Sequence, residues 1–215
     1  MSITAPTIPV APPKRRGRPK VDPAHSETRA KLIRAGLVHL TERGYGATGV
    51  DEILKAARVP RGSFYHHFGS KADFGLQLID AYDAYFSARL DRALGDDGLA
   101  PLDRLRGFMQ DAEAGMARHG FTRGCLIGNL GQEMGVLPEP FRARLIGVLA
   151  DWQALTATCL CAAKEDGALR ADLAPEALAA VFWTGWEGAV LRAKMERDPA
   201  PLRQFAGTYL NLITP

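Results

Sequence analysis

Apolar residues recur three and four positions apart along almost the whole chain. The pattern is clearest in three stretches, which carry the sets Leu32, Ile33, Leu37 and Leu40; Val50, Ile53, Leu54 and Ala57; and Phe74, Leu78, Tyr82 and Tyr85. This spacing places each set on one face of an α-helix, and no stretch shows the sustained apolar–polar alternation of a β-strand. The pattern therefore predicts an all-α protein.

Glycine and proline divide this pattern into helices. Gly44 and Gly46 end the first helix, and Thr48 or Gly49 caps the second. The expected helices after the first cover the ranges 50–57, 61–68, 71–94, 101–119, 122–135, 139–165, 175–196 and 201–213. Two short helices joined by a tight turn, over 48–71, form the pattern of a helix-turn-helix that reads the DNA major groove.

The third helix has an apolar and a polar face. Phe64 and Phe68 are four residues apart and point inward. The side chains left near the outer face are those of Arg61, Ser63, Tyr65 and His66. Residues of these types bind phosphates, base edges and thymine methyl groups, so this face is predicted to read DNA.

Three further residues extend the predicted DNA contact. Thr48 can cap free backbone N–H groups or donate to a phosphate. Gly62 lets the backbone approach closely, and Lys71 can neutralise a phosphate. A small helical subdomain with a solvated polar face is the alternative.

The charge distribution favours DNA as the partner. Residues 14–71 contain 13 basic and 5 acidic residues, a net charge of +8, whereas residues 72–215 contain 14 basic and 19 acidic residues, a net charge of −5. Such asymmetry is typical of a nucleic-acid-binding part joined to a carrier domain of different purpose.

A basic arm, KRRGRPK at 14–20, precedes the predicted helices. It resembles the AT-hook core, in which an extended Arg-Gly-Arg enters a narrow A·T minor groove. Arg15, Arg16, Gly17 and Arg18 are therefore predicted to bind DNA. The alternative is a solvated basic tail that adds only nonspecific affinity. Residues 1–24 are expected to be a disordered arm.

Composition also predicts where the protein works. Three cysteines without disulfide or zinc spacing fit a reducing cytosol. Cys159 and Cys161 fall on different faces of one helix and make no metal pair there. The N-terminus lacks the pattern of a signal peptide, and no 18-residue apolar run predicts a membrane span. A cytoplasmic protein with no metal, cofactor or membrane partner is expected.

The segment from Thr28 to Phe86, with VDEILKAARVPRGSFYHHFGSKADF at its centre, resembles the N-terminal domain of TetR-type transcriptional regulators. The resemblance implies an all-α homodimer, usually a repressor that a small ligand releases from DNA. It implies a DNA-binding domain over 25–86 and an effector-binding and dimerisation domain over 87–215. The implied DNA contacts are Thr48, Arg61, Gly62, Ser63, Tyr65, His66 and Lys71.

Two later segments are similar to one branch of that family: HGFTRGCLIGNLGQEMG at 119–135 and FWTGWEGAVLRAKME at 182–196. The branch includes electrophile-responsive repressors and the acrylate-responsive regulators of dimethylsulfoniopropionate breakdown. Cys125, with Arg123 beside it, is a candidate reactive thiolate. A small buried hydrophobic residue is the alternative. Lys194 is expected near Cys125, or exposed near a helix C-terminus.

Further effector contacts are expected on two helical faces. Trp186 and Glu187 share a face with Trp183, which we assign to packing rather than to a pocket. A second set, Asn129, Gln132 and Glu133, shares a face near Cys125. Arg123 or Lys194 would bind the carboxylate of an effector.

Dimerisation is expected through the helices over 139–165 and 175–196, because their apolar residues occupy more than one face. Phe141, Leu145, Ile146, Leu149, Trp152 and Leu155 belong to the first helix, and Leu178, Val181, Phe182 and Val190 to the second. A two-fold dimer would set two reading helices roughly 34–36 Å apart on a pseudo-palindrome.

The leading hypothesis is a repressor that leaves its operator on binding acrylate, a related conjugated carboxylate or another electrophile, such as a quinone or an aldehyde. The alternative is an effector-independent architectural binder of A·T-rich DNA. An enzyme is not expected, because Cys125 has no base–orienter set around it in the sequence and His66 and His67 face apart.

Overall fold

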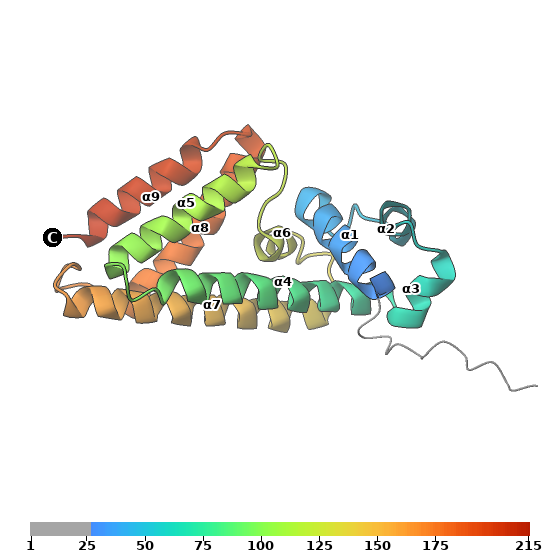
Figure 1. Ribbon diagram of the computed structural model, residues 1–215, viewed down its shortest axis with the longest axis horizontal. Helices are drawn as coiled ribbons and strands as arrows, with labels where there is room; N and C mark the ends of the chain where they lie inside the picture. Colours follow the sequence, from blue (N-terminus) through green and yellow to red (C-terminus); the bar gives the residue numbers. More distant parts are fainter. Residues whose placement is uncertain (1–26) are drawn as a thin grey trace, which may run out of the picture.

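The computed structural model describes residues 27–215, and this part of the chain is entirely helical (Figure 1). The predicted minor-groove residues Arg15, Arg16, Gly17 and Arg18 lie outside the described residues. The helices are α1 (Glu27–Arg43), α2 (Val50–Ala57), α3 (Arg61–His67), α4 (Lys71–Leu94), α5 (Pro101–Ala117), α6 (Leu126–Gln132), α7 (Glu139–Glu165), α8 (Pro175–Glu196) and α9 (Ala200–Ile213). The predicted all-α class is confirmed.

Helices α1, α2 and α3 pack around an aromatic cluster at one end of the molecule. Phe64 and Phe68 are fully buried, as expected, and the ring of Phe74 from α4 lies 5.2 and 4.6 Å from theirs. The three rings fix α3 on α4, since buried aromatic side chains contribute large apolar areas and edge-to-face contacts. We call α2 and α3, the helix-turn-helix, the reading head.

Helix α4 joins the reading head to the rest of the molecule, and α7 runs along it (Figure 1). The predicted domain boundary after residue 86 falls inside α4, so the two parts share one helix. Arg144 of α7 binds Asp80 and Asp83 of α4 at 2.6 and 2.8 Å. The indole of Trp152 donates to Asp83 and Ser87 on the same helix. These contacts hold α4 and α7 in register.

Helices α5, α8 and α9 complete the second part, at the end away from the reading head (Figure 1). Trp183 of α8 is buried and donates to the carbonyl of Trp152 and the hydroxyl of Thr156. Helix α7 is long and apolar enough to cross a membrane by length and composition, but it packs against helices on several sides and forms part of the core.

The apolar faces of α7 and α8 are mostly used within one chain. Among the residues assigned to dimerisation, those buried in the core are Phe141, Leu145, Trp152, Phe182 and Val190. Ile146 and Val181 remain 62% and 57% exposed. Apolar surface beyond the core of one chain thus remains on both helices, and its burial against a second copy stays a prediction.

Candidate functional site

The outer face of α3 presents polar and aromatic side chains to solvent. Arg61, Tyr65 and His66 are exposed, and Ser63 is half-buried beside them. No described atom lies within 4 Å of the position that a Cβ on Gly62 would occupy. The structure therefore brings the predicted residues of α3 together on one accessible face of the reading head.

The other two predicted contacts, Thr48 and Lys71, do not lie on α3 but at the turn between α1 and α2. Thr48 is fully buried and its hydroxyl donates to the carbonyl of Gly44 at 2.7 Å, while Gly49 is the N-cap of α2. The Lys71 ammonium donates to the carbonyl of Tyr45 at 2.8 Å and lies 4.2 Å from the centre of its ring. Burial lowers the pKa of Lys71. Both side chains bind the turn between α1 and α2. The Thr48 hydroxyl donates within the chain, and Lys71 is half-buried, so their contact with a DNA phosphate stays a prediction.

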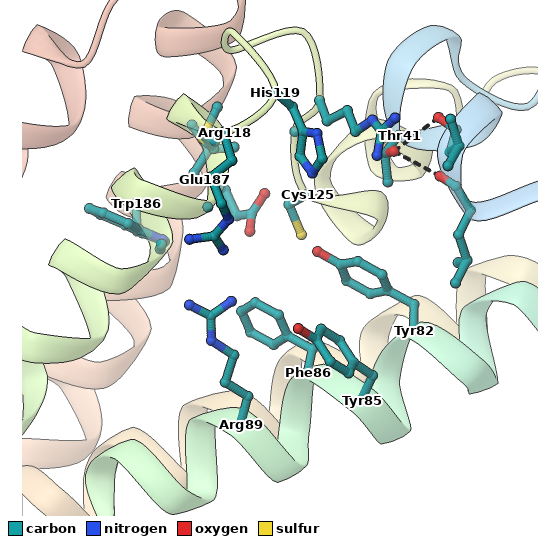
Figure 2. A pocket seen from close by; sticks show the side chains of 18 of the residues that line it. Thr41, Tyr82, Tyr85, Phe86, Arg89, Arg118, His119, Cys125, Trp186 and Glu187 are labelled. Carbon is teal, nitrogen blue, oxygen red and sulfur yellow. Dashed lines mark hydrogen bonds between the residues drawn. The ribbon is translucent and has the colours of Figure 1, made fainter. Parts of the chain in front are cut away.

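A cavity of about 320 Å³ lies in the second part of the chain, between α1, α4, α5, α8 and the segment before α6. We call it the effector cavity. Much of its wall is aromatic, and the aromatic residues are Tyr82, Tyr85, Phe86, Phe108 and Trp186 (Figure 2). This volume suits a small molecule, since ligand sites are mostly apolar concavities with a few placed polar groups.

A thiol, a phenol and a carboxyl group meet in the wall of the effector cavity. Cys125 is 8% exposed, and burial together with the negative charge of Glu187 raises its pKa well above the usual range. Burial also raises the pKa of Tyr82, and it raises the pKa of Glu187 to about 7. A Cβ atom on Gly128 would overlap the carboxylate of Glu187, so a larger residue there would require the Glu187 side chain to move.

The predicted activation of Cys125 by Arg123 is wrong. The Arg123 guanidinium forms an ion pair with Glu42 at 2.8 Å, and desolvation of the buried thiol disfavours its charged form. The raised pKa favours the protonated thiol. The structure thus supports the alternative reading, in which Cys125 is a small buried side chain in the cavity wall.

Two arginines that the sequence analysis did not identify line the effector cavity and could bind an anionic ligand. Arg89 of α4 and Arg118 at the end of α5 point toward one another across the effector cavity, near Glu187 (Figure 2). Arg89 is paired with Asp111 at 3.2 Å. Within residues 27–215, Arg118 has no hydrogen bond or ion pair from its side chain. His119 also lines the cavity.

A signal for Arg89 was present in the chain. It lies seven residues after Tyr82 and four after Tyr85, hence on the same face of α4. Arg118 carries no comparable local signal, because its side chain reaches the cavity only through the fold of the turn after α5.

The remaining predicted effector residues lie behind Cys125. A crevice of about 180 Å³ is lined by Asn129, Gln132 and Lys194 together with Cys125 and Glu187, so the expected proximity of Lys194 and Cys125 is seen. Lys194 donates to the carbonyl of Thr41 at 2.9 Å, and Asn129 donates to the same carbonyl at 2.8 Å. Lys194 therefore binds the end of α1. Arg123 lines the effector cavity but is paired with Glu42, so neither is an unpaired cation for an effector carboxylate.

Comparisons with known proteins identify two family regions. Residues 32–78 match the model described as bacterial regulatory proteins, tetR family, and residues 101–209 match the model described as tetracyclin repressor-like, C-terminal domain. The first region includes the reading head, and the second includes the α5, α6 and α8 residues that line the effector cavity.

Similar proteins span nearly the whole chain. The transcriptional regulator AcuR of Cereibacter sphaeroides is 62% identical, over 97% of this chain and 94% of its own length. The repressor DhaR of Mycobacterium sp. strain GP1 is 34% identical, over 89% of this chain and 95% of its own length. A crystal structure of regulatory protein TetR from Rhodobacter sphaeroides, 62% identical, covers 88% of this chain and all of that chain with a TM-score of 0.87. A crystal structure of reduced Escherichia coli NemR is 31% identical and covers 88% of this chain and 99% of that chain, with a TM-score of 0.78. The chain belongs to the TetR family of transcriptional regulators.

Proposed function

We propose that the protein is a cytoplasmic, homodimeric repressor that leaves its operator when a small conjugated carboxylate, such as acrylate, binds in the effector cavity. The observation that carries the proposal is a small, largely aromatic cavity into which the unpaired guanidinium of Arg118 points. The repressors DhaR and NemR and the regulator AcuR support the regulatory role. Acrylate is the first probe because the segments at 119–135 and 182–196 resemble those of acrylate-responsive regulators.

The geometry favours recognition of the effector without a covalent bond. A carboxylate between Arg118 and Arg89 would gain charge-assisted hydrogen bonds, and the conjugated carbons would lie against the aromatic wall. The raised pKa of Cys125 leaves little thiolate at neutral pH to attack them. Cys125 then shapes the cavity wall.

The exposed residues of α3 are proposed to bind bases and phosphates, with Arg61, Tyr65 and His66 in the major groove. Ile146 and Val181 support a dimer interface on α7 and α8, because exposed apolar side chains of this size favour burial against a second copy. The two reading heads would then meet successive turns of one DNA face.

The test compares three probes in a fluorescence-anisotropy assay on operator DNA. Acrylate carries both charge and conjugation, propionate carries only the charge, and acrylamide carries only the conjugation. We expect acrylate to release the wild-type protein, Cys125→Ser to respond as the wild type does, and Arg118→Met to need about tenfold or more acrylate, as loss of one charge-assisted contact implies.

Arg170→Met is the matched control, because Arg170 is paired with Asp172 far from the effector cavity. Equal release by acrylate and acrylamide would contradict carboxylate recognition and favour a general electrophile sensor. Loss of the response in Cys125→Ser would contradict non-covalent sensing. Equal affinity for operator and random A·T-rich DNA would favour the architectural alternative.

A further inference from the structure

The turn between α1 and α2, residues 44–49, is held by a carboxylate from the second part of the chain. Glu133 directly follows α6. Its Oε1 accepts a hydrogen bond from the backbone N–H of Tyr45 at 2.9 Å, and its Oε2 accepts one from Gly46 at 2.6 Å. We call this pair of hydrogen bonds the Glu133 clamp. Gly44 has φ +87°, and a Cβ there would overlap the Glu133 carboxylate, so the turn is shaped to receive it.

The last turn of α1, just before the clamp, is bound in the same way. Asn129 of α6 donates to the carbonyls of Leu40 and Thr41 at 3.2 and 2.8 Å. Lys194 of α8 donates to Thr41 at 2.9 Å. Helix ends leave backbone carbonyls without partners inside the helix, and here side chains distant in sequence bind them. The end of α1 and the turn that leads into the reading head are therefore bound to α6, Glu133 and α8 through backbone groups.

Helix α6 also forms part of the effector cavity. Cys125, its N-cap, lines the cavity wall, and Gly128 lies against the carboxylate of Glu187. Eight residues separate Cys125 from Glu133, a distance of roughly 12 Å along a helix at 1.5 Å per residue. A ligand that moves the backbone at Cys125 would move the start of this short helix, whose far end carries the clamp.

We propose that Glu133 is a positioning residue that sets the orientation of the reading head and passes movement of α6 to it. The carboxylate does this by binding two successive amides of the turn that leads into α2. The clamp itself depends only on the observed contacts. Its part in effector response rests on the function proposed above.

Glu133→Gln is the sharpest variant. The amide keeps the shape of the side chain but turns an NH₂ group toward one of the two N–H donors, so one hydrogen bond is lost. The freed turn allows the reading head more orientations, and operator affinity should fall by about tenfold, the cost of one charge-assisted bond. Affinity for a random duplex should stay at the control level, because every basic contact remains.

Glu139→Gln is the matched control. It removes the same charge from an exposed residue that pairs with Arg142 at the start of α7. Any gain in DNA affinity from neutralising one acidic residue appears equally in both variants. Hydrogen exchange at the amides of Tyr45 and Gly46 should accelerate in Glu133→Gln alone. Asn129→Ala, which removes the α6 donor from the carbonyls of Leu40 and Thr41, gives a second route if Glu133→Gln does not fold.

Effector linkage gives an independent readout. The factor by which acrylate weakens operator binding equals the factor by which operator weakens acrylate binding. In Glu133→Gln this factor should shrink severalfold, while the free protein binds acrylate as the wild type does.

The outcomes separate the two proposals. Operator affinity and amide exchange equal to those of Glu139→Gln would overturn the role of Glu133. If acrylate fails to release the wild type while Glu133→Gln still weakens operator binding, the choice of effector is wrong and the clamp stands. If acrylate releases both proteins by the same factor, Glu133 does not pass on the movement of α6.

Discussion

At the scale of single residues, burial in the wall of the effector cavity disfavours the charged form of Glu187. Its carboxyl group lies beside the Cys125 thiol and against Gly128, where desolvation raises its pKa from 4.5 to about 7. A carboxyl group with a raised pKa stabilises the fold when protonated. Its stabilising effect is complete below the unfolded-state pKa and is lost as pH rises through the folded-state value. An anionic ligand nearby would favour the protonated form further.

Glu187→Gln should therefore change how stability depends on pH. Between pH 5.5 and 8 the wild type should lose about 1–2 kcal/mol more unfolding free energy than the variant, a range that allows for the partial exposure of Glu187. Urea unfolding at fixed protein concentration and both pH values measures this difference. Parallel curves for the two proteins would show that Glu187 does not titrate in this range.

At the scale of helices, close approach at small residues decides the packing of α1 on α4. A Cβ on Gly36 would lie 2.6 Å from Cζ of Phe74 and 2.8 Å from Cδ1 of Leu78. Both neighbours are fully buried and belong to the core beneath the reading head. Gly107 in α5 differs, because no described atom lies within 4 Å of its equivalent position.

The two glycines should respond to alanine in opposite ways. Gly107→Ala should stabilise the protein by about 0.5–1 kcal/mol, since alanine is the better helix former. Gly36→Ala gains the same helix propensity but overpacks the core at a cost of about 1–3 kcal/mol, so a net loss is expected. Chemical unfolding of both variants tests this, and stabilisation by Gly36→Ala would show that Phe74 and Leu78 can move aside.

The helices were predictable because their signals are local. Apolar spacing with Gly and Pro punctuation predicted α2, α7 and α8 with the observed limits. The helix predicted over 122–135, interrupted by glycines, is shorter in the structure, since the chain is non-helical over 122–125 and α6 ends at Gln132. The cavity was predicted less well. The sequence identified Cys125, Trp186 and Glu187 as residues of the site. It did not identify Arg118 or the Glu133 clamp, because both depend on contacts between segments far apart in the sequence.

At the scale of the whole molecule, positive charge is concentrated at the DNA-binding end. Residues 14–71 carry a net charge of +8, and residues 72–215 carry −5. Five of the basic residues are Lys14, Arg15, Arg16, Arg18 and Lys20 in the N-terminal arm. The acidic remainder disfavours wrapping of DNA around the second part, so binding should be confined to the reading heads and arms.

Deleting residues 2–20 should make operator binding less sensitive to salt. Each lost phosphate contact lowers the slope of log K against log salt by about 0.9, so a decrease of about 4.5 is expected for each arm whose five charges all bind. Replacing A·T pairs beside the operator by G·C should weaken the full-length protein but not the deletion variant. An unchanged slope would mean that the arm does not contact DNA.

The hydrogen bond between Lys194 and Thr41 joins residues 153 positions apart, and the Glu133–Tyr45 bond spans 88. The ribosome adds about 5–20 residues per second, so Thr41 is made roughly 8–30 s before Lys194. Helices α1 to α3 have all been synthesised once the chain reaches His67. The side chains that bind the end of α1 and the following turn come later, from α6, Glu133 and α8. The DNA-binding residues of α3 are therefore synthesised well before the α8 residues that line the effector cavity.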